Sequence, residues 1–549
     1  GNEVEEANGS PRSIETAKRL KAIIKAIDTE RYVTMGENKF SRAATGDFLK
    51  LAEIMDAVGM NYGERFYDAV RRAHPDWLIY GSETSSATRT RDSYYNPAQI
   101  LGHDNRPNRH YEQSDYGNDR VGWGRTATES WTFDRDRAGY AGQFIWTGID
   151  YIGEPTPWHN QDSTPVKSSY FGIIDTAGLP KNDFYLYRSE WYSAKEKPTV
   201  RILPHWNWTE ETLKDRKMLV DGKVPVRTFS NAASVELFLN GQSLGKKEYT
   251  KKRTEDGRPY HEGAKPSELY LEWLVKYQPG TLTAIARDEN GNEIARDSVT
   301  TAGEPARVRL TKEEHVITAD GKDLSYIHYE IVDGEGNVVP TANNLVHFNL
   351  HGQGQIVGVD NGEQASRERY KAQADGTWQR RAFNGKGVVI VKSTEKEGKF
   401  TLYADSAGLT SDSATVATVS GKKENRHFVA FAPVKATTDV TTNPELPQTV
   451  TAIYSDGSVE EKTVTWDMPA DLLTSAGEKK VSGRVEGLET QAEALVKVIA
   501  LDRWLPKVAT VPVGTAAADL DKTVTAVLTD GSLIDTDVVS WTLKDPSAL

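Results

Sequence analysis

The sequence contains no cysteine. The chain can therefore form no disulfide bond and no thiolate metal site, and it has no thiol nucleophile. It also has no apolar run that approaches the roughly 20 residues of a membrane-spanning helix. These absences argue against membrane insertion and against thiol catalysis. They are compatible with secretion by a bacterium.

Basic residues are fewer than acidic ones in this sequence. The 549 residues include 67 Lys and Arg against 79 Asp and Glu, which gives a net charge of -12. No basic block stands out along the chain. Nucleic acids and anionic membranes are therefore poor candidate partners. The length by itself predicts roughly three to five domains.

Aromatic residues, in contrast, are abundant. The chain has 13 Trp and 23 Tyr, crowded mainly between positions 77 and 208. Sugars bind by stacking on aromatic faces, although the same side chains also fill protein cores. The composition thus leaves carbohydrate binding open without requiring it.

The N-terminal part alternates between helix and strand patterns. Ser10 and Pro11 have the form of a helix cap followed by a first helical residue, and apolar residues then recur at helical spacing as far as Ile27. Further helices are expected over 47–57, 65–74 and 183–193, and strands over 32–35, 58–62, 77–80 and 142–147. We expect Gly36 to break the first of these strands and a long polar loop to follow the third. Repeated strand-helix units predict parallel strands with right-handed crossovers, in a doubly wound sheet or a (β/α)8 barrel.

Two carboxylates stand at the ends of this pattern. Glu3 and Glu83 each follow a strand, so that both side chains can point into the same mouth. Two carboxyl groups that face each other across a cleft are the minimum equipment for cleaving a glycosidic bond. In a barrel, catalytic groups come from the C-terminal ends of several strands. Asn2, Tyr62 and Trp146 stand at such ends too.

Four motifs, in order and with their spacing, carry a resemblance to a known family. They are Gly1-Asn2-Glu3, Tyr80-Gly81-Ser82-Glu83, Gly142-Gln143-Phe144-Ile145-Trp146-Thr147-Gly148-Ile149-Asp150-Tyr151 and Phe171-Gly172-Ile173-Ile174-Asp175. Together they resemble glycoside hydrolase family 2. More narrowly, the chain is similar to the large surface β-galactosidases of Gram-positive bacteria, over about residues 1 to 420.

The resemblance implies a role for each residue of the predicted site. Glu3 would end the fourth barrel strand as acid/base, and Glu83 would end the seventh as nucleophile. Asn2 would hold the sugar 2-hydroxyl, Tyr62 would hydrogen-bond the nucleophile, and Trp146 would wall the sugar subsite. No cofactor is implied. The partner implied is a carbohydrate substrate, a terminal β-galactoside.

The resemblance also implies that residues 1–197 are the C-terminal half of a TIM-barrel catalytic domain. A sugar-binding sandwich, an immunoglobulin-like domain and the first half of the barrel would precede them in a longer protein. We therefore expect this chain to need that missing N-terminal part of the same protein, and to be inactive alone.

The chemistry can be argued from the residues themselves. Cleavage with retention of configuration needs one ionised and one protonated carboxyl at the start. A tyrosine hydroxyl that donates to Glu83 favours its ionised form, and Glu3 can act as base once a glycosyl-enzyme has formed. The Asn-x-Lys element by which related glucuronidases grip the acid group is missing around residues 168–172. A neutral sugar, galactose first, is therefore favoured.

Several further residues lie in loops near the predicted mouth, and the sequence leaves their roles open. They are Glu37, Asn38, Trp158, His159 and Asn160. His159 has no second histidine or carboxylate at ligand spacing, and residues 333–337 lack the twelve-residue calcium pattern. We expect ordinary loops there and predict no metal site.

After about residue 198 the pattern changes to strands and turns, as at the Asn240-Gly241 hairpin signal. We expect all-β, immunoglobulin-like sandwiches over 198–303 and 304–420. An internal repeat follows, because Thr449 and Trp466 recur as Thr523 and Trp541 at offsets of 74 and 75 residues. It predicts one bacterial immunoglobulin-like module over 433–500 and part of a second over 501–549, acting as spacers.

These observations lead to one functional hypothesis and a rival. The hypothesis is an extracellular or cell-wall attached bacterial enzyme, a retaining exo-β-galactosidase that acts on terminal β-galactosides of glycans. The rival is a non-catalytic adhesin or carbohydrate-binding surface protein, in which the barrel remnant is only a scaffold. A family 2 hydrolase for another β-glycoside is a third possibility.

Overall fold

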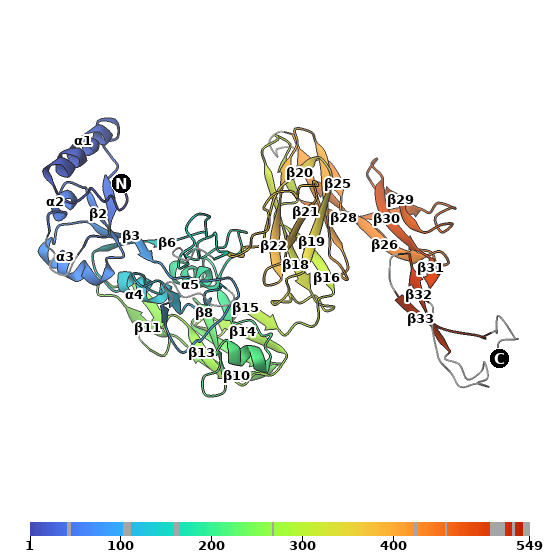
Figure 1. Ribbon diagram of the computed structural model, residues 1–549, viewed down its shortest axis with the longest axis horizontal. Coiled ribbons are helices and arrows are strands. Elements are labelled where there is room, and N and C mark those ends of the chain that lie inside the picture. The colour runs from blue at the N-terminus through green and yellow to red at the C-terminus, as the bar shows by residue number, and fades with distance from the viewer. Residues whose placement is uncertain are drawn as a thin grey trace.

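The computed structural model describes residues 1–40, 46–102, 111–158, 164–265, 268–420, 427–455, 458–505, 522–529 and 533–541. Figure 1 shows an elongated chain of successive units, with helices and a small parallel sheet at the N-terminal end and strands throughout the rest. His159 and Asn160 lie outside the described residues, as do residues 506–521 and 542–549 of the predicted second module.

The N-terminal unit contains a parallel sheet of order β1-β2-β3-β6. Its strands are β1 (Thr34–Glu37), β2 (Ala57–Asn61), β3 (Ile79–Ser85) and β6 (Tyr140–Trp146). Asn2 adds a parallel bridge to Gly36 of β1. The C-terminal ends of five successive segments therefore meet at one edge, as the alternating pattern predicts. Closure into a (β/α)8 barrel stays a prediction.

Gly36 lies inside β1, which corrects the expectation that it breaks the strand. A Cβ atom at this position would lie 2.6 Å from Asn2 Oδ1 and 2.9 Å from Asn61 Oδ1. Glycine is needed here for close approach of side chains from the neighbouring segments, rather than for a turn.

The helices follow the predicted order with different lengths. They are α1 (Pro11–Ile27), α2 (Leu49–Ala52), the 3-10 helix η1 (Glu64–Phe66), α3 (Tyr67–Ala73), α4 (Ala127–Arg135), α5 (Asn182–Trp191) and α6 (Glu210–Asp215). Ser10 caps α1 as expected. The helix expected over 47–57 is shorter than predicted, since α2 ends at Ala52. The last predicted residue, Ala57, begins β2 instead. Helix α4 stands where a long polar loop was expected, and a Thr126–Glu129 capping box starts it.

Helix α1 buries none of its residues. Its apolar side forms a groove with neighbouring residues, among them Leu20, Ile24, Val33, Leu51 and Met55. Ile27 is 86% exposed. The amphipathic pattern therefore predicts the helix correctly, but nothing in the described part of the chain covers its apolar face.

Two sheets follow the N-terminal unit, of order β10-β9-β14-β15 and β13-β8-β7, with the β11-β12 hairpin beside them. The strands are β7 (Val200–Leu203), β8 (Val224–Ser230), β9 (Ser234–Leu239), β10 (Gln242–Glu248), β11 (Thr250–Arg253), β12 (Pro259–Glu262), β13 (Leu271–Val275), β14 (Thr281–Arg287) and β15 (Glu293–Thr300). Leu186 and Tyr187 of α5 share their core with Ile202 and Val226, so this sandwich is built onto the α/β unit.

The short pair β4 (Leu101–Gly102) and β5 (Asp119–Arg120) lies in the loop region before α4.

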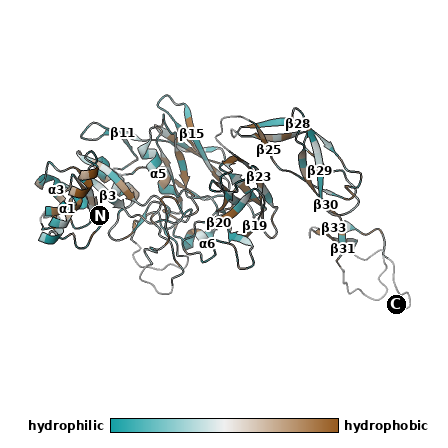
Figure 2. Cartoon of the chain, turned by 90° about the horizontal axis from the view of Figure 1, so that it is seen from above, coloured by the Kyte–Doolittle hydropathy of each residue, from teal (hydrophilic) through white to brown (hydrophobic). Residues whose placement is uncertain are grey.

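The next sandwich pairs sheets of order β16-β18-β22-β20 and β17-β24-β23-β19-β21. Its strands are β16 (Arg307–Lys312), β17 (Val316–Thr318), β18 (Leu324–Val332), β19 (Leu345–Gly352), β20 (Gly354–Asp360), β21 (Trp378–Arg381), β22 (Lys386–Ser393), β23 (Gly398–Asp405) and β24 (Asp412–Val419). Figure 2 shows apolar residues on strands of both sandwiches, such as β15 and β23. In strands such as β18 and β23, buried residues alternate with more exposed ones, so that one face of the strand packs on the core.

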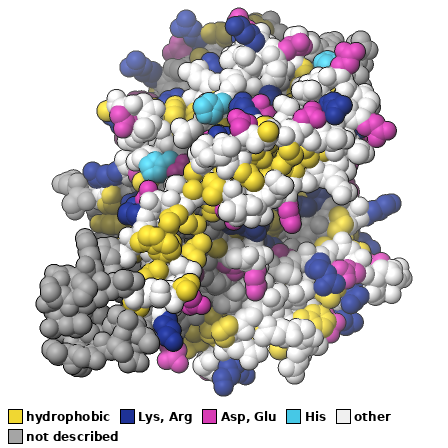
Figure 3. Space-filling model, turned by 90° about the vertical axis from the view of Figure 1, so that its right-hand side faces the viewer, with side chains coloured by type: hydrophobic (Ala, Val, Ile, Leu, Met, Phe, Trp, Pro, Cys, Tyr) yellow, Lys and Arg dark blue, Asp and Glu magenta, His cyan; other side chains and the backbone are white. Residues whose placement is uncertain are grey.

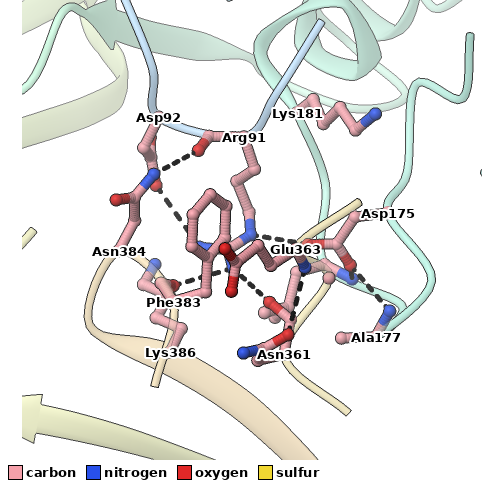
Figure 4. Close-up of polar contacts among 12 residues, drawn as sticks. Arg91, Asp92, Asp175, Ala177, Lys181, Asn361, Glu363, Phe383, Asn384 and Lys386 are labelled. Carbon is pink, nitrogen blue, oxygen red and sulfur yellow. Dashed lines mark hydrogen bonds and ion pairs between the residues drawn. The ribbon is translucent and has the colours of Figure 1, made fainter. Parts of the chain in front are cut away.

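A buried polar cluster joins this second sandwich to the α/β unit (Figure 4). Arg91 comes from the segment that follows β3, and its Nε lies 2.6 Å from Asp175 Oδ2. Its Nη2 donates to the carbonyl oxygens of Asn361, at 2.9 Å, and Phe383, at 3.0 Å. In return, Asn384 Nδ2 donates to the Arg91 carbonyl at 2.7 Å.

The C-terminal strands form a six-stranded sheet and a three-stranded one. They are β25 (Phe428–Phe431), β26 (Val434–Asp439), β27 (Thr449–Tyr454), β28 (Val459–Asp467), β29 (Gly477–Val485), β30 (Ala492–Ile499), β31 (Leu501–Trp504), β32 (Thr523–Leu528) and β33 (Leu533–Asp537). Thr451 Oγ1 donates to Glu461, and Thr525 Oγ1 donates to Asp535, both at 2.6 Å. The sequence repeat is therefore a structural repeat. Seen from this end, positive and negative side chains are interspersed over the surface (Figure 3).

Candidate active site

The structure brings all five predicted site residues to one cavity at the C-terminal edge of the parallel sheet. The cavity has a volume of about 630 Å³. Its lining consists of Asn2, Glu3, Asn38, Asn61, Tyr62, Arg65, Phe66, Glu83, Ser86, Trp123, Trp146, Glu154 and Phe171. Glu3 and Glu83 thus face the same space although 80 positions separate them. Their catalytic roles remain predictions.

Glu83, near the end of β3, is held by two donors. Asn2 Nδ2 donates to its Oε1 at 2.6 Å, and the Tyr62 hydroxyl donates to its Oε2 at 2.9 Å. Both carboxylate oxygens are therefore fixed. Asn2 donates to Glu83 here, whereas the resemblance assigns it to the sugar 2-hydroxyl.

Glu3 is held by Asn61, at the end of β2. Asn61 Nδ2 lies 3.0 Å from Glu3 Oε1 and 2.9 Å from Asn2 Oδ1. The Ser82 hydroxyl donates to Asn61 Oδ1 at 2.5 Å, which fixes the orientation of the amide. Asn61 and Asn2 therefore connect the two glutamates in one hydrogen-bonded chain.

The backbone is strained at these strand ends. Glu3 has a φ of 47° and Tyr62 a φ of 50°, both in the left-handed region that residues with a side chain rarely adopt. The pairing of β2 with β3 is also irregular at this point. Met60 pairs with Gly81, but the next residue, Asn61, pairs with Glu83, so Ser82 is skipped. The irregularity brings Asn61 level with Glu83 at the cavity.

Burial shifts the pKa of three side chains at and beside the cavity, Glu83, Tyr62 and Glu37. It raises the pKa of Glu83, and the hydrogen bonds from Tyr62 and Asn2 act in the opposite direction. Burial and the Glu83 charge raise the pKa of Tyr62 far above its ordinary value, so this hydroxyl stays a proton donor. Burial also raises the pKa of Glu37, which lies beside Glu3 on the next strand.

Aromatic side chains wall the other side of the cavity. Trp146 ends β6, and its ring lies edge-on to that of Tyr151 at 5.8 Å between centroids. The Tyr151 hydroxyl donates to Glu154. Arg89 Nη1 donates to the carbonyl of Phe171 at 2.6 Å, which fixes the last wall residue.

The residues whose roles the sequence left open divide between the cavity and the core. Asn38 lines the cavity. Glu37 is 1% exposed beneath it. Trp158 is fully buried and packs against Tyr170 at 4.8 Å between ring centroids, as a core residue does.

Sequence reasoning missed several residues of the lining. They are Asn61, Arg65, Phe66, Ser86, Trp123 and Glu154. Asn61 immediately precedes Tyr62 at a strand end, and the same argument that selected Tyr62 could have found it. Trp123 stands between two glycines in a region read as polar loop, where no local signal indicates a site.

Two carboxylates that face one cleft at the C-terminal edge of a parallel sheet are the arrangement that cleavage of a glycosidic bond needs. Comparison with protein families points to the same class of enzyme through other parts of the chain. Residues 308–415 match the family described as glycoside hydrolase family 2 C-terminal domain 5. Residues 221–295 match a domain of unknown function, DUF4982, and residues 431–488 match a bacterial Ig-like domain of group 4.

Curated relatives agree with the family match. The chain is 38% identical to a β-galactosidase of Bacteroides ovatus over 398 residues, which are 71% of this chain and 42% of that protein. It is 29% identical to a putative β-glucuronidase of Formosa agariphila, over 66% of this chain and 32% of that protein. The chain therefore spans less than half the length of these relatives.

Solved structures show the same likeness. A β-glycosidase from Bacteroides vulgatus matches with a TM-score of 0.58 and 26% identity, over 73% of this chain and 49% of that one. A glycosyl hydrolase family 2 member from Bacteroides cellulosilyticus matches with a TM-score of 0.56 and 25% identity, over 76% of this chain and 48% of that one. The family model over residues 308–415, the curated relatives and these solved structures thus agree on a likeness to glycoside hydrolase family 2.

None of the helices in the described ranges is long and apolar enough to cross a membrane.

Proposed function

We propose that the protein containing this chain is a retaining exo-β-galactosidase, with Glu3 as acid/base and Glu83 as nucleophile. The observation that carries the proposal is the hydrogen-bonded chain from Glu3 through Asn61 and Asn2 to Glu83, at one cavity. It holds two carboxyl groups toward the same space, as double displacement requires.

The first step forms a glycosyl-enzyme. Glu3 gives its proton to the glycosidic oxygen while a Glu83 oxygen attacks the anomeric carbon, so that the bond to the leaving group breaks as a bond to Glu83 forms. Tyr62, which donates to Glu83 Oε2, stabilises the ionised nucleophile before attack.

The second step releases the sugar. Covalent attachment removes the negative charge of Glu83, and Glu3 then takes a proton from water as that water attacks the anomeric carbon. The bond to Glu83 breaks, and both carboxyl groups return to their starting states. Two inversions give net retention of configuration.

A neutral sugar fits the charges of the cavity. Three carboxylates, Glu3, Glu83 and Glu154, line it with a single cation, Arg65. Lys167 is the cation nearest in sequence to residues 168–172, and its Nζ lies 4.3 Å from the centroid of the Tyr370 ring, outside the lining. The likeness to the Bacteroides ovatus β-galactosidase supports galactose. The Formosa agariphila relative and Arg65 favour a β-glucuronide as second candidate.

We propose further that the active enzyme includes barrel strands beyond the four described here. The uncovered apolar side of α1 supports this, since a complete barrel would bury it. For the same reason we expect residues 1–549 alone to be inactive. The bacterial Ig-like match supports a spacer role for the C-terminal strands, in an extracellular or wall-attached enzyme.

The proposal is tested with a complete-barrel protein, in which the missing barrel half precedes residues 1–549. It should hydrolyse nitrophenyl β-galactoside faster than nitrophenyl β-glucuronide, and Glu83→Gln should abolish this activity. An NMR time course should show the β-anomer released first. Failure to hydrolyse either glycoside would favour the adhesin, and early release of the α-anomer would exclude retention.

A further inference from the structure

Lys39 binds the turn that follows Glu3. Its ammonium nitrogen donates to the carbonyl oxygens of Val4 at 2.7 Å, Glu5 at 3.3 Å and Ala7 at 3.4 Å. The backbone nitrogen of Ala7 also donates to the Val4 carbonyl, at 3.0 Å, which closes the turn. One cation therefore joins three backbone groups of a single short turn.

The same ammonium group lies beside a buried carboxylate. Lys39 Nζ is 3.4 Å from Glu37 Oε1, and the Glu37 side chain is only 1% exposed. The other carboxylate oxygen, Glu37 Oε2, has no hydrogen-bond partner among the described residues. A buried carboxylate is costly unless it is paired, so Lys39 supplies an ion pair that Glu37 needs.

Both partners of Lys39 are joined to Glu3 through the backbone. The turn begins at Val4, the next residue along the chain. On the other side, the backbone nitrogen of Glu3 donates to the carbonyl of Gly36, the residue before Glu37, at 2.9 Å. Glu3 itself has a φ of 47°, a strained conformation that persists only where the surrounding structure enforces it. Lys39 thus connects the turn after this strained residue to the end of β1.

We propose that Lys39 is a positioning residue for Glu3. Its ammonium group holds the turn after Glu3 against the end of β1, and so keeps the carboxyl group directed at the glycosidic oxygen. Lys39 does not belong to the cavity lining, so it acts through Glu3 rather than on the substrate. This inference rests on the proposed function, in which Glu3 protonates the leaving group.

The test compares leaving groups that differ in their need for a proton, in the complete-barrel protein. Lys39→Met keeps a long side chain and removes its donors. It should lower kcat/KM for methyl β-galactoside by about tenfold, a part of the roughly 10²–10⁴-fold that general acid catalysis contributes. For dinitrophenyl β-galactoside the change should be less than about twofold, because dinitrophenolate leaves without protonation. Lys50→Met, at a side chain 57% exposed in α2, is the control and should affect neither substrate.

Azide gives a second measurement, on the step that releases the sugar. Water that attacks the glycosyl-enzyme must give a proton to Glu3, whereas azide has no proton to lose. An azide nitrogen forms a bond to the anomeric carbon as the bond to Glu83 breaks, and a glycosyl azide is the product. Azide should therefore raise kcat for dinitrophenyl β-galactoside several-fold in Lys39→Met and leave that of the unsubstituted protein unchanged.

Glu37→Gln tests the same arrangement if Lys39→Met does not fold, as judged by circular dichroism. It keeps the size of the side chain and removes the negative charge beside Lys39. The contacts of Lys39 with the turn remain in this variant. The ratio of kcat/KM for the methyl glycoside to kcat/KM for the dinitrophenyl glycoside should therefore fall as in Lys39→Met, by a smaller factor.

The outcomes separate this proposal from the proposed function. Equal losses on the two glycosides, or no acceleration of Lys39→Met by azide, would overturn the role of Lys39 and leave the galactosidase standing. An unsubstituted complete-barrel protein that cleaves neither glycoside would overturn both.

Discussion

The side-chain amide of Asn61 donates a hydrogen bond of 3.0 Å to the carboxylate of Glu3. The same nitrogen lies 2.9 Å from Asn2 Oδ1, and Asn61 is only 1% exposed. Because Ser82 donates to the amide oxygen, the nitrogen must face Glu3 and Asn2. A buried amide at the end of β2 therefore sets the positions of two side chains on the N-terminal segment.

Asn61→Asp should disrupt the site while keeping its shape. A carboxylate in place of the amide offers no donor to Glu3 and repels it. We expect kcat/KM of the complete-barrel protein to fall by roughly 100-fold, because misplaced catalytic groups lose their orientation. Steady-state kinetics measures this, and Asn290→Asp, in an exposed turn, is the control. Full activity of Asn61→Asp would show that Glu3 does not depend on this bond.

Tyr62→Phe should shift the acidic limb of the pH profile upward. The Tyr62 hydroxyl lowers the pKa of Glu83, so its removal raises that pKa further. Below its pKa, Glu83 is protonated and cannot attack. The variant should therefore lose kcat/KM at a higher pH than the unsubstituted enzyme as pH falls. A profile of kcat/KM from pH 4 to 8 tests this, with the exposed Tyr32→Phe as control. An unmoved acidic limb would contradict the assignment of that limb to Glu83.

Arg91→Met should destabilise the junction between the α/β unit and the second sandwich. Arg91 and Asp175 are almost fully buried, so removing the cation takes away the ion-pair partner of Asp175. Breaking a buried pair in this way costs about 3–5 kcal/mol. Arg381→Met is the control, because the Arg381 side chain is 55% exposed and such pairs contribute about 1 kcal/mol or less. Urea denaturation should separate the two, and equal losses would mean that burial of the pair is unimportant.

Asp134→Asn should stabilise the protein, and more so as pH rises. Burial raises the pKa of Asp134 to about 9, and the charge of Glu64 adds to this. An unfolded chain releases this proton near its ordinary pKa, whereas the folded chain retains it, so stability falls between these two values as pH rises. Asn carries no such proton. Its Tm should exceed that of the unsubstituted protein by several degrees at pH 8 and by little at pH 4. The exposed Asp221→Asn is the control, and a constant difference at both pH values would contradict the prediction.

The parallel strands and the gathering of Glu3, Glu83, Tyr62 and Trp146 could be predicted from the sequence. Strand ends are marked by local patterns, and parallel strands bring those ends to one edge. Gly36 was misread because a glycine inside a strand and one that breaks it look alike along the chain. Only the contacts with Asn2 and Asn61 distinguish the two cases.

Other features depend on contacts that no local pattern records. The loop that carries Trp123 is held at the cavity by a backbone bond from Arg125 to Ser85, 40 positions earlier in the chain. Helix α4, by contrast, had a readable signal in its Thr126–Glu129 capping box, and the surrounding polar residues concealed it. For α1, the apolar periodicity predicts the helix. It does not indicate which part of the protein packs against the apolar side.

Gln364, in the second sandwich, donates to the Arg89 carbonyl at 3.2 Å and to Asp150 Oδ2 at 3.0 Å, across 275 and 214 positions of the chain. During synthesis the ribosome makes Arg89 and Asp150 long before Gln364 emerges. The loops that contain Arg89 and Asp150 therefore gain these two hydrogen bonds only after the second sandwich has been synthesised. A nascent chain arrested within the first sandwich would carry both glutamates and still lack the support behind them.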